Sequence, residues 1–240
     1  MNSCSKNGGI MNQIITLKIP YQFSEEIEFL YPVVLLDHKE MILVDCGYNG
    51  FMQDIENALE EQGLKASELT KIVITHHDHD HMGALAAFKE KYPAIQIVTS
   101  NIEAPFVSGK EKSLRLIQAE AAQENLPEDQ KPFGLAFCEL LKSVRPVEVD
   151  IEVQGGDFYD WCGGCKIIAT PGHTPGHISL YLPEHNTIIT GDGAVVEKGQ
   201  LVVANPLYTL NLNKAEQSLE ELLSYKGATF ICYHGGIYKE

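Results

Sequence analysis

The chain has 240 residues, 44% of them hydrophobic and 21% charged, which is a globular composition with enough apolar material for a sizeable core. Its 33 acidic and 18 basic residues give a net charge of −15, which argues against nucleic acid as a partner because an acidic chain repels phosphates. No stretch approaches the roughly 20 apolar residues of a membrane span, and residues 1–10 lack the apolar core of a secretory signal. With six scattered cysteines, a reduced cytoplasmic protein without membrane contact is expected.

The first hundred residues alternate between strand and helix patterns, which is typical of α/β architectures. We expect residues 1–12 to be a disordered extension and residues 13–240 to form a single domain. Apolar runs predict strands at 13–19, 31–36, 41–46, 71–74 and 95–99, and helical spacing predicts helices at 51–59 and 82–88.

Residues 101–145 have a different pattern, in which helical spacing dominates. Pro127 and Pro132 are expected to break this region into pieces. We interpret it as a helical insertion, which either covers a site or serves as outer scaffold.

From Pro146 onward the chain returns to strand patterns. Asn213 is a plausible N-cap for a helix that runs through Tyr225. The two β-rich stretches on either side of the helical middle look like two halves of one domain. Strands are predicted at 166–170, 178–182, 187–190 and 229–232.

A dense group of histidines and aspartates, residues 76–81, follows the apolar run 71–74. A buried strand that ends in such a loop delivers imidazoles and carboxylates to one place. Imidazole nitrogen and carboxylate oxygen are the ligands that Zn²⁺ and related divalent ions accept. The sequence therefore predicts a metal site at the end of this strand.

The order of the motifs resembles that of the metallo-β-lactamase-fold hydrolases. That family is marked by a His-x-His-x-Asp-His loop after a strand, then a later His, a later Asp and a final His. Here the loop is residues 76–81, and Leu43-Val44-Asp45-Cys46-Gly47 is similar to the family's early strand-end motif. The later motifs are TPGHTPGH at 170–177, TGDG at 190–193 and YHGG at 233–236, so that the resemblance covers about residues 13–238.

The resemblance implies an α/β (α+β) fold, a four-layer αβ/βα sandwich with a helical insertion, and two metal ions at the sheet edges. Asp192 would bridge the ions, and Asp45 would orient ligands from behind. Asp80 would be catalytic: it would orient a hydroxide that bridges the ions and later help to protonate the leaving group. The implied ligands are His76 and His173 for the first ion, with Asp78 in the family's second-histidine position, and Asp80, His81 and His234 for the second.

Asp78 departs from the family pattern, which has histidine there. It could ligate the first ion itself, a shifted loop could let His77 or His79 ligate instead, or the first ion could be weak or absent. We favour direct ligation by Asp78, since residues two apart in an extended segment face the same way. Two divalent ions are expected; zinc is favoured, and iron or manganese are alternatives because a carboxylate oxygen is a harder ligand.

The function implied by the resemblance is hydrolysis of a small-molecule ester, lactone or thioester. The alternative is a diiron redox or oxygen-handling protein of the same fold, which would use Asp78 and perhaps Cys162 and Cys165. Protein coloured by iron would favour the alternative, and colourless zinc protein with esterase activity would favour hydrolysis.

Some other residues resemble functional ones but have structural explanations. The run Trp161-Cys162-Gly163-Gly164-Cys165 looks like a redox motif, yet its glycines and the β-branched run after it favour a hairpin turn. His177 is interpreted as a structural partner of its turn. Tyr233 is expected to point away from the site, and Tyr208 is a weak candidate for contact with substrate.

Overall fold

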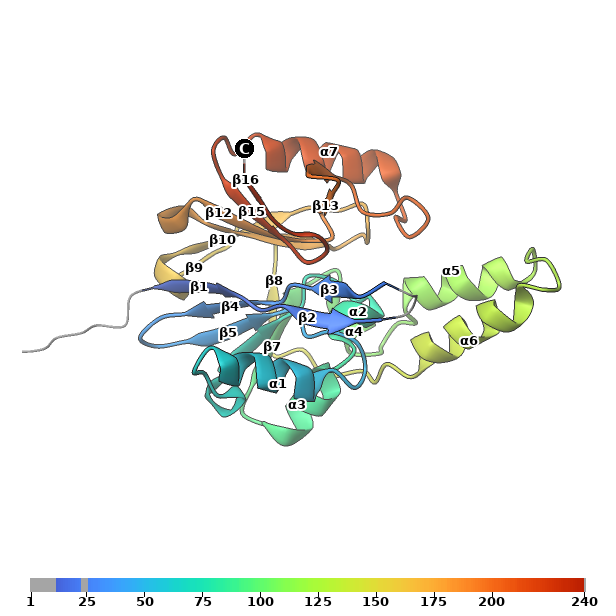
Figure 1. The fold of residues 1–240 in the computed structure, drawn as a ribbon, viewed down its shortest axis with the longest axis horizontal. Coiled ribbons are helices and arrows are strands. Elements are labelled where there is room, and N and C mark those ends of the chain that lie inside the picture. Colours follow the sequence, from blue (N-terminus) through green and yellow to red (C-terminus); the bar gives the residue numbers. More distant parts are fainter. Residues whose placement is uncertain (1–11, 23–25, 240) are drawn as a thin grey trace, which may run out of the picture.

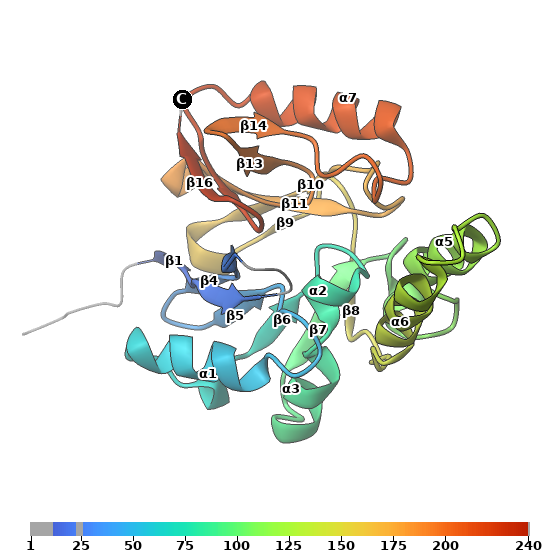
Figure 2. The same ribbon diagram turned by 45° about the vertical axis from the view of Figure 1, so that its right-hand side comes forward.

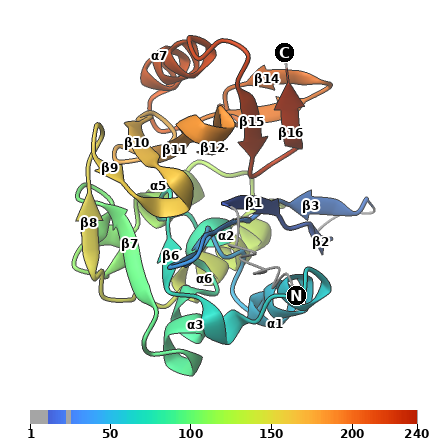
Figure 3. The same ribbon diagram turned by 90° about the vertical axis from the view of Figure 1, so that its left-hand side faces the viewer.

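Two six-stranded sheets lie face to face at the centre of the computed structural model, which describes residues 12–22 and 26–239 (Figure 1). Helices cover the outer face of each sheet, so the predicted four-layer αβ/βα sandwich is confirmed. Figure 3 shows the two sheets from the side, with α7 on one outer face and α1 and α3 on the other. The predicted extension 1–12 lies, except for Asn12, outside the described residues.

The first sheet is built from apolar runs because both of its faces are buried. Val34, Leu43 and Ile72 pack toward the helices α1 and α3, whereas Val44 and Val73 pack against the second sheet, as the alternation of side chains along a strand requires. Its order is β1 (Gln13–Thr16), β4 (Val33–Leu36), β5 (Met41–Val44), β6 (Lys71–Val73), β7 (Gln96–Ser100) and β8 (Ile151–Val153), covered by α1 (Met52–Glu61) and α3 (Leu85–Lys91).

The second sheet packs one face on the first sheet and the other on α7 (Leu212–Leu223). Leu180 and Ile189 belong to the core between the sheets, and Ile188 and Phe230 pack with Leu222 of α7. The order of this sheet is β16 (Gly236–Lys239), β15 (Thr229–Cys232), β12 (Thr187–Gly191), β11 (Ile178–Leu182), β10 (Cys165–Ala169) and β9 (Phe158–Tyr159).

Short elements connect these layers. Two small ribbons form beside the sheets, and short helices occupy several loops. They are β2 (Ile19–Tyr21) with β3 (Glu28–Leu30), β13 (Val195–Glu197) with β14 (Gln200–Val202), the helices α2 (His79–Met82) and α4 (Ala104–Val107), and the 3₁₀ turns Ala66–Glu68, Trp161–Gly163 and Pro183–His185.

The predicted helical insertion is present and projects from the sandwich as a helical arm, residues 114–142 (Figure 2). It consists of α5 (Leu114–Gln123) and α6 (Lys131–Lys142), which pack on each other through Leu116, Ala119, Cys138 and Leu141. Pro132 does not break a helix as expected. It lies in the first turn of α6, where a missing backbone N–H costs no hydrogen bond.

Other boundaries also differ from the sequence expectations. The strand expected at 13–19 is divided into β1 and β2. The helix α7 is capped by Asn211, whose side chain accepts a hydrogen bond from the backbone N–H of Lys214, and not by Asn213, which lies within the first turn. None of the helices in the described part of the chain is long and apolar enough to cross a membrane.

Candidate metal centre

The predicted ligands come from separate loops that meet at one edge of the sandwich. The loop 76–81 follows β6, Asp192 follows β12 and His234 follows β15, while His173 lies in the connection between β10 and β11. The structure brings all seven predicted ligands into three overlapping groups whose ligand atoms lie within 4.8 Å of one another. The groups are His76, Asp78 and His173; His76, His81 and Asp192; and Asp80, His81 and His234.

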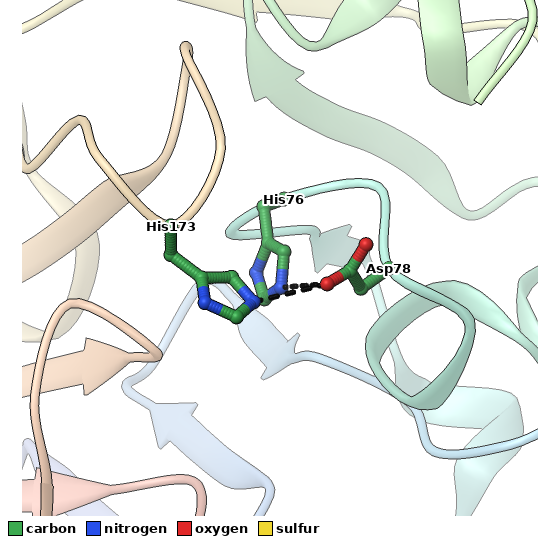
Figure 4. Close-up of side chains that lie close together, drawn as sticks. All are labelled: His76, Asp78 and His173. Atoms are coloured by element: carbon green, nitrogen blue, oxygen red, sulfur yellow. Dashed lines mark hydrogen bonds and ion pairs between the residues drawn. The ribbon is translucent and has the colours of Figure 1, made fainter. Parts of the chain in front are cut away.

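The first group, His76, Asp78 and His173, converges on one carboxylate oxygen (Figure 4). Asp78 Oδ2 lies 3.0 Å from His173 Nε2 and 3.5 Å from His76 Nε2. All three residues are buried. The carboxylate that replaces the usual histidine therefore faces the two imidazoles, as direct ligation by Asp78 would require.

The group Asp80, His81 and His234, called the second group from here on, is arranged in a similar way. Asp80 Oδ2 lies 3.1 Å from His234 Nε2 and 3.7 Å from His81 Nε2. His234 is the most exposed member, with 27% of its side chain accessible. The second group is thus the part of the site closest to solvent.

Asp192 lies between the two groups. Its Oδ2 is 3.4 Å from His173 Nε2, and its Oδ1 is 3.4 Å from His81 Nε2 and 3.6 Å from His234 Nε2. One carboxylate oxygen therefore faces each group, which is the geometry of a bridging ligand.

Several ligand-type atoms at this site are buried without a hydrogen-bond partner among the described residues. They include His76 Nε2, His81 Nε2 and Asp192 Oδ1. Buried polar atoms are almost always paired, so three orphaned lone-pair donors pointing together fit a bound cation. The residues present therefore fit divalent ions of the kind expected from the sequence.

The far side of these imidazoles is held by Asp45 and Thr75. His81 Nδ1 lies 2.8 Å from Asp45 Oδ2, and His76 Nδ1 lies 3.0 Å from Thr75 Oγ1. Asp45 Oδ1 also accepts from the backbone N–H of Thr75. With the Nδ1 atoms engaged, the Nε2 atoms of both rings are directed into the site, so Asp45 has the orienting contact expected of it.

The charges of the site favour ionised carboxylates. Burial alone would raise the pKa of Asp80, but the neighbouring His81 and His234 outweigh it and lower that pKa. Burial, together with the nearby His81 ring, lowers the pKa of His76. At His81 and His234 the neighbouring carboxylates outweigh burial and raise the pKa. A deprotonated carboxylate and a neutral imidazole are the forms that bind a cation, so an ion would displace a proton from these two rings.

His177 and Tyr233 support the site from behind. The ring of His177 contacts Thr170 Oγ1 through Nδ1 and accepts from the backbone N–H of Asp192 through Nε2, at 3.0 Å. The Tyr233 ring lies tilted against the His81 ring, and its hydroxyl donates to the carbonyl of Asp80. Neither residue belongs to a candidate group, and the Tyr233 hydroxyl is committed to the backbone.

His77 and His79, which the sequence left open as alternative ligands, lie outside the groups. His77 pairs with Glu103 through Nδ1, and its Nε2 accepts from the backbone N–H of Leu114 at the start of α5. The His79 ring lies edge-on to Tyr48 and near Phe137. Asp78, and not its neighbours, therefore occupies the position next to His76 and His173.

Glu103 is a buried residue that sequence reasoning missed. Its Oε2 accepts from the backbone N–H and the ring of His77, and its Oε1 accepts from Thr174 Oγ1 and the backbone N–H of Gly176, both at 2.8 Å. It therefore ties the loop 76–81 of the first half to the loop 173–177 of the second. A glutamate just after an apolar strand was the only signal in the sequence.

Arg115 was also missed. It lies on α5, is 2% exposed, and its guanidinium pairs with Asp78, with Nη2 at 2.6 Å from Oδ2 and Nε at 3.3 Å from Oδ1. Burial opposes the ionisation of Asp78, but the guanidinium together with the neighbouring His173 and His76 outweighs it, and the pKa of this carboxyl is held well below its usual range. The signal was a lone arginine among apolar residues of the insertion.

Cys162 lies in the turn that joins β9 to β10, and Cys165 is the first residue of β10, so the two cysteines belong to a hairpin as predicted. Both thiols are buried and free. Burial raises the pKa of Cys162 to about 11 and that of Cys165 to about 12, so neither is a thiolate at neutral pH.

Comparison with known proteins agrees with this geometry. The model of the metallo-beta-lactamase superfamily matches residues 31–234, and the chain therefore belongs to that superfamily. The predicted class of enzyme, a metal-dependent hydrolase, is confirmed.

The similar proteins are distant relatives. The probable metallo-hydrolase YflN of Bacillus subtilis (strain 168) is 24% identical over 205 residues, which cover 81% of this chain and 75% of that protein. The hydroxyacylglutathione hydrolase of Bartonella henselae is 29% identical over 175 residues, 72% of this chain, and the chain spans about half of that enzyme's length (53%). A metallo-beta-lactamase family protein from Thermus thermophilus has the same fold, with a TM-score of 0.72 at 22% identity over 94% of this chain and 74% of that one.

Proposed function

We propose that this protein hydrolyses a small-molecule ester, lactone or thioester with two divalent ions, one at each of the groups that Asp192 joins. The observation that carries the proposal is the position of Asp192, whose two oxygens face the two groups. The Nε2 atoms of His76 and His81 support it, since both are buried and neither has a hydrogen-bond partner among the described residues.

Bound divalent ions supply an acidified water near neutral pH and polarise the carbonyl oxygen of a substrate. The protein's own residues position the reactants. Asp80 stays ionised because of its histidine neighbours, so its free lone pairs act as acceptors that orient the attacking water. The same carboxylate is the group placed to receive a proton and pass it to the leaving group.

The substrate class and the metal are supported by separate observations. A thioester is supported by the name of the hydroxyacylglutathione hydrolase of Bartonella henselae, although this chain matches only about half of it. Zinc is the favoured metal because four of the seven proposed ligands are imidazoles, and the carboxylate of Asp78 keeps iron and manganese as alternatives.

Metal content and hydrolysis measured together test the proposal. Protein purified without added metal is analysed for zinc, iron and manganese, then assayed with 4-nitrophenyl acetate, a γ-lactone and an acyl-glutathione thioester. We expect Asp192→Asn to lose both bound metal and hydrolysis, because it weakens both groups, whereas the control His185→Ala, in a turn away from the site, keeps both. Full activity in metal-free protein, or in Asp192→Asn, would contradict the proposal.

A further inference from the structure

We propose that Arg115 and a divalent ion compete for the same oxygen of Asp78, so that the helical arm closes on the first group only when that group lacks its ion. This inference rests on the proposed function, because it concerns the ion expected at the first group. It assigns a role to the helical arm. From the sequence alone, the arm could be either a cover over the site or part of the outer scaffold.

The first step is the geometry around Asp78. Its Oδ2, the oxygen that faces His76 and His173, also accepts from Arg115 Nη2 at 2.6 Å and from Nε at 3.2 Å. The same Nη2 lies 3.4 Å from His173 Nε2. The guanidinium is therefore directed at two of the three ligand atoms of the first group.

The second step is the chemistry of the guanidinium. Arginine stays protonated in proteins and has no lone pair to offer a metal ion. A lone pair on Asp78 or His173 that receives an arginine N–H is not available to a cation, and a divalent ion beside a buried guanidinium is repelled. Ion binding at the first group therefore requires Arg115 to move away.

The third step is what else moves with Arg115. Its Nη1 donates to Gln118, one turn further along α5, and Gln118 in turn donates to the carbonyl of Leu207. The ring of Tyr208 lies 5.4 Å from the guanidinium carbon. Arg115 thus takes part in the contacts between the helical arm and the loop around 207–208. When Arg115 moves away, these contacts weaken, and the arm and the loop become less firmly held.

The second group has no such competitor. The side chains that face the Asp80 carboxylate are the rings of His79, His81 and His234, and no arginine or lysine pairs with this carboxylate in the described chain. We therefore expect unequal affinities, with tight binding at the second group and weak binding at the first.

Zinc titration of metal-free protein at pH 7.5 tests this competition. Wild type, Arg115→Met and the control Arg145→Met are titrated with zinc against a chromophoric chelator; Arg145 pairs with Glu90 on the surface. We expect two binding steps in wild type, one tight and one weak. In Arg115→Met the affinity of the weak step should rise by roughly 100-fold, because Asp78 no longer has to give up a buried charged partner when the ion binds. The tight step, and both steps of Arg145→Met, should be unchanged.

A second readout follows the arm itself. Amide hydrogen exchange over residues 114–123 of wild type should increase when the weak step is saturated and stay constant through the tight step. Arg115→Met should show the faster exchange without zinc. Circular dichroism and thermal unfolding confirm that this variant is folded.

The opposite results would overturn the inference. If the zinc affinity of the weak step is unchanged or lower in Arg115→Met, then Arg115 orients a ligating Asp78 and does not compete with the ion. If hydrogen exchange in α5 does not respond to zinc, then the helical arm does not move when the ion binds. Failure of the proposed function looks different, because zinc would then bind at neither step in either protein.

Discussion

Replacing Glu103 with glutamine is a sharp test of how the two halves of the site are held together. The side chain is fully buried and accepts four hydrogen bonds, two on each oxygen. Glutamine has the same shape but only one acceptor oxygen, and its NH₂ group faces donors at the other position. In the best orientation the amide oxygen serves His77, Thr174 rotates to accept, and the N–H of Gly176 is left without a partner.

The expected loss follows from this count. One buried donor without a partner and one hydrogen bond from His77 to a carboxylate reduced to a bond with a neutral amide cost about 2–6 kcal/mol of unfolding free energy, at roughly 1–3 kcal/mol for each group. The burial of Glu103 raises its pKa, but His77 outweighs burial and the net pKa is lowered from the usual 4.5. A lowered carboxyl pKa gives the fold a stabilisation that is fully present above the usual value and is lost as pH falls through the lowered one.

Urea unfolding followed by the fluorescence of the single tryptophan measures this loss. It is done with EDTA present, because a bound ion would add its own stabilisation. The matched control is Glu148→Gln, whose carboxylate is 78% exposed and makes only a 3.6 Å surface pair with Lys110. If Glu103→Gln at pH 7 were within about 0.5 kcal/mol of this control, or if its deficit did not shrink below about pH 4.5, the reasoning would be refuted.

Two further predictions concern the site and the cysteines. Asp45→Ala should lower zinc affinity by about 10–100-fold, because His81 loses the contact that directs its Nε2 into the site, while Asp160→Ala on the surface should leave it unchanged in the same titration. In native Cys4→Ser protein, Ellman's reagent should detect no fast-reacting thiol, since the five remaining cysteines are buried, and five after unfolding. A fast native thiol would restore a redox role for Cys162 or Cys165.

The convergence of the candidate metal ligands could be predicted from the sequence because their chemistry is carried by residue type and local spacing. The loop 76–81, His173, Asp192 and His234 all meet where expected. Most strands of the two sheets were also predictable, since continuous apolar runs mark strands that are buried on both faces, whereas the short edge strands β8, β9 and β16 were not predicted.

The partners of these residues could not be predicted in the same way. Arg115 and Glu103 act through contacts with residues 37 and 26 positions away, and only the folded arrangement brings them together. Asn211 and Asn213 are chemically identical caps, so residue type alone could not decide which of them starts α7. The pairing of β16 beside β15 likewise depends on a glycine-rich turn whose conformation is not encoded in an apolar pattern.

The division of the candidate ligands between the two halves of the chain makes the protein suited to fragment complementation. Each candidate group takes two residues from before the β8–β9 connection and one from after it. A chain cut at Gly155-Gly156, in the turn between those strands, would leave every group incomplete on both pieces. Recovery of zinc binding on mixing would then report reassembly of the sandwich directly, without any attached label.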